Sequence, residues 1–163
     1  MEPENILKGR IAEGLVEELL KQCGNKVYRF GYETILQNLT QIDKSFDRES
    51  EIGRKIRSIP DFIVINEQGR PFFIEVKFRT EFLPYRKDVD RFDSIEKLWN
   101  PKIIIVTVEK PYFMISNNPP QKEEGNWNWE PLRNNQDLGI KKDVLEKFEK
   151  LVEKYCIKKP TKI

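Results

Sequence analysis

The sequence of 163 residues contains no histidine. This absence excludes a histidine-dependent catalytic triad and a His-ligated metal site, so any catalysis must use carboxylates, lysine, tyrosine or a metal held by oxygen ligands. Cysteine is scarce as well, because Cys23 and Cys156 are the only two and neither has a CxxC or Cys/His companion. We therefore expect both cysteines to be reduced and half-buried in the packing, and not to form a zinc or iron–sulfur site.

An excess of charge of one sign is also missing. The 29 basic and 27 acidic side chains nearly cancel, so nucleic-acid binding would depend on local patches rather than on bulk charge. No apolar run reaches the length of a membrane span, and the N-terminus opens with acidic residues rather than with a basic region. We therefore expect a cytoplasmic protein without membrane segments, folded as a single domain over residues 1–163.

Apolar periodicity predicts three helices and five strands. One helix is expected over 4–22, with Gly24 as its left-handed C-terminal cap. Others are expected over 88–99 and over 141–156, the last opened by a capping box at Asp143 and Glu146. Alternating or β-branched runs predict strands at 26–32, 59–65, 71–78, 102–108 and 112–116. The predicted fold class is α/β, with a mixed β-sheet of about five strands flanked by helices.

Two segments give weaker signals. Residues 33–57 have scattered apolar positions among many charges, and we interpret them as an insertion or mobile segment, such as a short helix followed by a loop. Residues 117–139 are rich in Asn and Pro and are expected to form an ordered loop. Trp127 and Trp129 would pin this loop to the core, although stacking on unpaired bases is an alternative.

The tetrapeptide "NEQG", residues 66–69, predicts a hairpin whose register decides where three charged residues lie. With a three-residue loop at 67–69, Asp61 faces Glu75 across the hairpin, and Lys77 projects from the same face. A two-residue loop at Gln68-Gly69 would instead place Asp61 on the opposite face. The three-residue loop therefore predicts two carboxylates and one ammonium in one cluster.

Such a cluster suits phosphodiester hydrolysis. Two neighbouring carboxylates repel each other, and hard oxygen ligands at this spacing suit Mg²⁺ or Mn²⁺. Lys77 could orient or help deprotonate an attacking water, or stabilise negative charge on a phosphate. The alternative is an ordinary ion pair of Asp61 with Lys77 while Glu75 is solvated. Ile63 and Phe73 favour the cluster, because their apolar side chains predict an otherwise buried face.

Pro60-Asp61, thirteen intervening residues and Glu75-Val76-Lys77 resemble the motif of the PD-(D/E)XK nuclease superfamily. The segment Lys8–Leu20 is similar to the opening helix of archaeal Holliday-junction resolvases. The resemblance implies a restriction-endonuclease-like core and a metal-dependent endonuclease acting on duplex or branched DNA.

By the same resemblance, Asp61 and Glu75 would bind Mg²⁺ or Mn²⁺, and Lys77 would be the catalytic lysine. Glu13 would complete the site from the opening helix, directly or through water; on a helical wheel it lies at the edge of the apolar stripe. Glu17, one turn later, is the competing choice. A homodimer is expected because cutting a duplex or a junction needs two incisions. The alternative is a nuclease-like module that binds nucleic acid or protein without cutting.

Basic side chains flank the proposed site on both sides and are candidates for phosphate contacts. They are Arg54, Lys55, Arg57, Arg79, Arg86 and Lys87. Acidic residues lie among them, so a solvated charged surface is the competing interpretation.

Overall fold

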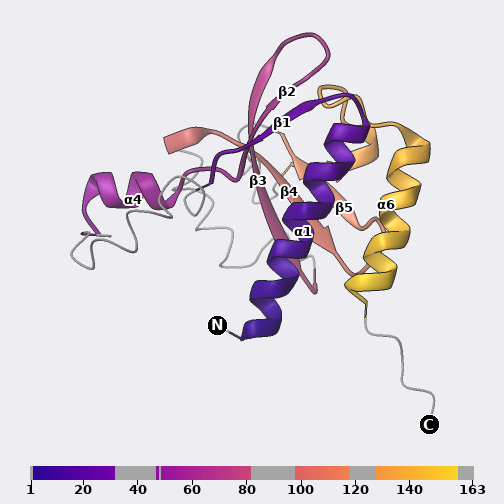
Figure 1. Ribbon diagram of the computed structural model, residues 1–163, viewed down its shortest axis with the longest axis horizontal. Helices are drawn as coiled ribbons and strands as arrows, with labels where there is room; N and C mark the ends of the chain where they lie inside the picture. The colour runs from indigo at the N-terminus through magenta and orange to yellow at the C-terminus, as the bar shows by residue number, and fades with distance from the viewer. Residues whose placement is uncertain (1, 32–46, 48, 82–97, 118–127, 158–163) are drawn as a thin grey trace.

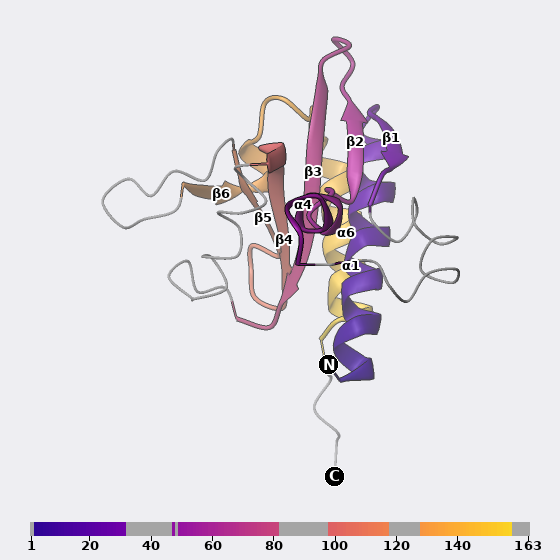
Figure 2. The same cartoon turned by 90° about the vertical axis from the view of Figure 1, so that its left-hand side faces the viewer.

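A six-stranded sheet with helices packed across one face organises the chain. The computed structural model describes residues 2–31, 47, 49–81, 98–117 and 128–157. Neighbouring strands follow the order β1-β2-β3-β4-β5-β6, and Figure 2 shows α1 and α6 together on one side of the sheet. None of the described helices combines the length and apolar character needed to cross a membrane.

The sheet is mixed, as predicted, but it has six strands instead of about five. The strands are β1 (Lys26–Arg29), β2 (Phe62–Ile65), β3 (Pro71–Arg79), β4 (Lys102–Thr107), β5 (Phe113–Ser116) and β6 (Trp129–Pro131). Only β3 and β4 run parallel, and the other neighbours in the sheet are antiparallel. The sixth strand lies in the segment that we expected to be a loop. It is three residues long and ends in proline, so it gives almost no strand pattern.

The helices predicted near the N-terminus and near the C-terminus are confirmed. Helix α1 spans Pro3–Gln22 and α6 spans Lys142–Tyr155, and Gly24 has the positive φ of 95° expected for the cap. The capping box is wrong, because the N-cap of α6 is Lys141, which makes no side-chain cap hydrogen bond. The helix expected at 88–99 falls largely outside the described residues, except for its last two positions.

Helix α4, Glu51–Arg57, corrects our interpretation of 33–57 at its C-terminal end, where we expected a loop. Ser50 caps it, because its hydroxyl accepts a hydrogen bond from the backbone N–H of Gly53 at 3.0 Å. Figure 1 shows α4 on the side of the molecule opposite α6. The rest of that stretch, apart from residues 47 and 49–50, lies outside the described residues.

The hairpin has the three-residue register. Ile65 pairs with Pro71 and Ile63 with Phe73, and the N–H of Asn66 donates to the carbonyl of Arg70 at 3.0 Å. Gly69 adopts a φ of +75° in the turn, a conformation that favours glycine. The strand pairing from which we predicted that Asp61 lies opposite Glu75 is therefore correct.

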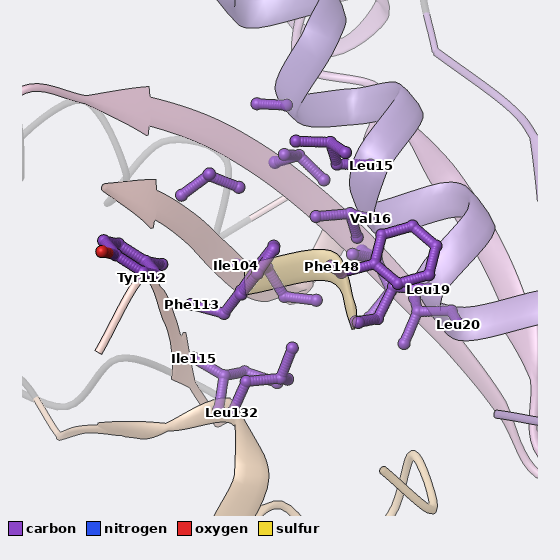
Figure 3. Packing of buried hydrophobic residues seen from close by; sticks show 14 of the residues in the cluster. Leu15, Val16, Leu19, Leu20, Ile104, Tyr112, Phe113, Ile115, Leu132 and Phe148 are labelled. Atoms are coloured by element: carbon purple, nitrogen blue, oxygen red, sulfur yellow. The ribbon is translucent and has the colours of Figure 1, made fainter. Parts of the chain in front are cut away.

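The core lies between the sheet and the two long helices (Figure 3). Leu15, Val16 and Leu19 of α1 pack towards Ile104 of β4 and Phe148 of α6. Cys23 and Cys156 are free and fully buried rather than half-buried.

The main core occupies the sheet face that carries Val64 and Ile74. The expectation of a buried face around Ile63 and Phe73 is correct only in part, because both side chains are partly exposed. On the same face, Ile103 and Ile105 of β4 pair with Glu75 and Lys77 and are buried. The charged cluster therefore shares its face with both buried and half-exposed apolar residues.

Candidate active site

Asp61 is held in place by the strands on either side of it. It directly precedes β2, and its carbonyl accepts hydrogen bonds from the N–H groups of Phe30 at 2.8 Å and Gly31 at 3.1 Å. Its carboxylate Oδ2 accepts a hydrogen bond from the N–H of Val76 at 2.7 Å. The carboxylate thus lies against β3 at the residue between Glu75 and Lys77.

Glu75 and Lys77 contact each other on β3. Glu75 is 5% exposed, and the Lys77 ammonium donates a hydrogen bond to its Oε1. The alternative in which Lys77 pairs with Asp61 while Glu75 is solvated does not fit this arrangement. The hairpin and the alternation of β3 together bring the three predicted side chains to one place.

Negative charge exceeds positive charge in this cluster. The pKa of Asp61 is raised to about 8, first because burial disfavours the charged form and then because Glu75 lies nearby. Glu13 raises it further, whereas Lys77 and the hydrogen bond from Val76 act in the opposite direction. Burial alone would lower the pKa of Lys77, but the charges of Glu75 and Asp61 raise it overall. Lys77 is therefore a stable ammonium at neutral pH.

The two candidate glutamates of α1 have different surroundings. Glu13 is partly buried, and its charge acts on Asp61. Glu17 instead accepts hydrogen bonds from Lys21, at 2.9 Å, and from Arg29. Burial would raise the pKa of Glu17, but these two partners lower it. Glu13 is therefore the helix carboxylate associated with the site, while Glu17 belongs to a surface ion-pair network.

The carboxylates suit a divalent ion in part. Within the described residues, no three Asp, Glu, Cys or His side chains are grouped so that they could hold a metal ion together. Asp61 and Glu75 are nevertheless two hard oxygen donors with unbalanced negative charge, and one or two carboxylates with several waters are a common set for Mg²⁺. Glu13 would then take part through water rather than directly.

The predicted phosphate contacts are only partly described. Arg54 and Lys55 are exposed on α4, whereas Arg57 forms an ion pair with Glu49 at 3.1 Å. Arg79 is partly buried and donates to the carbonyl of Phe78 at 2.8 Å. Arg86 and Lys87 lie outside the described residues.

An aromatic cluster beside the site was missed by our sequence reading. Phe30 and Phe73 stack with ring centroids 5.8 Å apart, and the indole of Trp99 meets both rings nearly at right angles. Phe73 precedes Glu75 by two residues, so it shares the face of the acidic cluster. The alternation of β3 was a usable signal for Phe73, but nothing local associates Trp99 with it.

Trp127, one of the two tryptophans of the expected loop, lies outside the described residues. Trp129 lies in β6, where it pairs with Ser116 of β5, so it is tied to the sheet. No protein-family model matches the sequence, and no curated protein gives a significant match to it.

Proposed function

We propose that this protein is a divalent-metal-dependent nuclease that hydrolyses DNA phosphodiester bonds. The observation that carries the proposal is the convergence of Asp61, Glu75 and Lys77, with a raised pKa at Asp61. A strongly perturbed carboxylate with a named charged neighbour is typical of functional sites. A purely structural ion pair would lower the pKa of its carboxylate instead.

The order of the elements supports a restriction-endonuclease-like core. Helix α1 and strand β1 precede the β2–β3 hairpin, and β4 then pairs in parallel with β3. This order brings Glu13 of α1 within electrostatic reach of Asp61 at the start of the hairpin. It agrees with the resemblance that the sequence motif suggested.

Each residue of the site has a distinct role in this proposal. Asp61 and Glu75 would hold Mg²⁺ or Mn²⁺, which supplies Lewis-acid activation of the phosphodiester when bound. Glu13 would orient water at the site. Because Lys77 is protonated at neutral pH, it stabilises the negative charge that develops on the phosphate rather than accepting a proton.

The proposed substrate is duplex or branched DNA, and the proposed assembly is a homodimer that makes two incisions. Arg54 and Lys55 are exposed on α4, which ends four residues before Asp61. Their cations would neutralise phosphates of the strand that enters the site. Arg57, Arg79, Arg86 and Lys87 remain proposed contacts of the same kind.

Cleavage assays with matched variants test the proposal. Linear, nicked, flapped and four-way DNA are incubated with the full chain in Mg²⁺, Mn²⁺ or EDTA. We expect Glu75→Gln and Lys77→Met each to reduce the cleavage rate by about 10² to 10³-fold. Glu13→Gln should reduce it by about 10 to 100-fold, as for residues that orient metal ligands. Glu17→Gln, one helical turn away, is the control and should cleave normally.

The outcomes separate the proposal from its rivals. Unchanged cleavage by Glu75→Gln and Lys77→Met would place the active site elsewhere. Equal losses in Glu13→Gln and Glu17→Gln would show that α1 acts through stability rather than through the site. DNA binding without cleavage in any metal would support a non-catalytic nuclease-like module instead.

A further inference from the structure

Helix α4 has little of its own to hold it in place. It is seven residues long, and Gly53 is its one buried residue. Ile52 is 71% exposed, so α4 does not bury an apolar stripe against the sheet. Helices this short are unstable in water without external contacts. A specific anchor is therefore needed to give α4 a fixed position.

Trp99 supplies a contact at the C-terminal end of α4. Its indole Nε1 donates a hydrogen bond to the carbonyl of Lys55 at 3.2 Å. Carbonyls in the last turn of a helix lack partners within the helix, and this one also accepts from the hydroxyl of Ser58 at 3.0 Å. The indole hydrogen bond thus connects α4 to Trp99, which lies just before β4.

The same indole packs against the two segments that support the acidic cluster. The centroid of its ring lies 5.5 Å from the ring centroid of Phe73, which is two residues before Glu75, and 5.7 Å from that of Phe30. The N–H of Phe30 donates to the carbonyl of Asp61. Trp99 is consequently in contact with α4, with the strand that carries Glu75, and with the residue bonded to Asp61.

We propose that Trp99 is a positioning residue that fixes α4 beside the acidic cluster, so that Arg54 and Lys55 form a binding surface for a nucleic-acid phosphate backbone. The inference rests on the proposed nuclease function for the choice of partner. It adds an anchor to that function and explains how a marginal helix could present cations in a constant position. The competing explanation is that these cations only stabilise α4, through a favourable interaction with the negative end of its helix dipole.

Paired substitutions test this coupling in the full chain. Trp99→Phe keeps an aromatic ring against Phe30 and Phe73 but removes the indole N–H. We expect it to weaken binding of a fluorescent DNA duplex, measured in EDTA to prevent cleavage, by about three- to tenfold. Arg54→Gln with Lys55→Gln should weaken binding more and lower the salt slope by about two. Adding Trp99→Phe to that double variant should cause little further loss.

Two controls distinguish positioning from general stability. Trp129→Phe, which removes an indole N–H from β6, should leave DNA affinity unchanged. In cleavage assays, Trp99→Phe should raise KM and leave kcat near that of the wild type. Hydrogen exchange without DNA should be faster for the amides of α4 in Trp99→Phe, with β3 unchanged.

Several outcomes would overturn the inference. Unchanged exchange in α4 would show that Trp99 does not hold the helix. Fully additive losses in the combined variant would show that Trp99 and the two cations act separately. A wild-type chain that binds no nucleic acid would remove the phosphate-binding surface. Salt-dependent binding that follows the expected pattern, without cleavage, would support the inference and contradict only the nuclease activity.

Discussion

Lys77 and Lys102 lie on the adjacent parallel strands β3 and β4. Carboxylates outnumber the cation around Lys77, whereas Lys102 is matched by one carboxylate. The Lys77 ammonium has more than one carboxylate nearby, and the pKa of Asp61 is raised to about 8. Lys102 is 3% exposed and donates to the carboxylate of Asp137 at 2.9 Å and to the amide oxygen of Asn117 at 3.0 Å. Its hydrogen bond lowers the pKa of Asp137.

The partners of Lys102 are themselves tied to the fold. The amide of Asn66 donates to the backbone carbonyl of Asp137 at 2.9 Å, and the amide of Asn135 donates to Asn117 at 2.7 Å. Such a network stabilises a unique arrangement of the β6 side of the sheet. The comparison shows that a lysine becomes a functional candidate through unbalanced charge around it rather than through burial, because Lys102 is the more deeply buried of the two.

Removal of each lysine tests this difference, and the largest effect on stability is expected at Lys77. Lys77→Met leaves Glu75, which is 5% exposed, without its cation and close to Asp61, so we expect the free energy of unfolding to fall by about 2–4 kcal/mol. Urea denaturation measures the change. Lys102→Met should cost less, about 1–2 kcal/mol, because its partner Asp137 is 32% exposed and also forms an ion pair with Arg70. Equal costs at the two positions would contradict the comparison.

Acidification provides the next test, at Asp137. Its folded pKa lies below the ordinary value, so its stabilising contribution is present above the unfolded pKa and is lost as pH falls through the folded pKa. Asp137→Asn should lower stability at pH 7 by about 1.5–3 kcal/mol, nearer the lower figure because the side chain is 32% exposed. Unfolding curves measured from pH 7 to 2 should converge with those of the wild type in acid. A constant difference across this range would show that the hydrogen-bond geometry, rather than the charge, matters.

The two regions also differ in how much the sequence predicted. The register of the acidic cluster followed from local signals, since Gly69 and the alternation of the two strands determine which side chains oppose each other. The Lys102 network gave no such signal, because Asn117 and Asp137 are 15 and 35 residues away. Lys102 itself begins a β-branched run that indicates only a buried strand.

The missed elements have the same physical cause. Helix α4 buries too little apolar surface to produce a helical pattern, and β6 is too short to alternate clearly. Tertiary contacts between segments that are distant in sequence, such as the one between Trp99 and α4, hold such elements in place. The partial exposure of Ile63 and Phe73 was not predicted either, because apolar residues occupy both faces of β3 and give no sign of how deeply each is buried. Long-range packing decides which face is buried.

The smallest effect on stability, and the one of opposite sign, is expected at Asp61. Its folded pKa is raised to about 8, so the folded state favours the neutral acid, and the wild type loses stability as pH rises from the unfolded pKa towards 8. Asp61→Asn should therefore be more stable than the wild type by about 0.5–2 kcal/mol at pH 8, a typical gain when functional strain is removed. The two proteins should be nearly equal below pH 4.

Divalent ions sharpen this last comparison. Mg²⁺ or Mn²⁺ relieves the repulsion between Asp61 and Glu75, so it should raise the Tm of the wild type at pH 8, by an amount that grows with ion concentration. The Tm of Asp61→Asn should respond much less, and that of Asp137→Asn should shift as the wild type does. A Tm shift shared equally by all three proteins would mean that the ion binds away from the acidic cluster. A shift absent only in Asp61→Asn would instead tie the excess negative charge beside Lys77 to metal binding, independently of any cleavage assay.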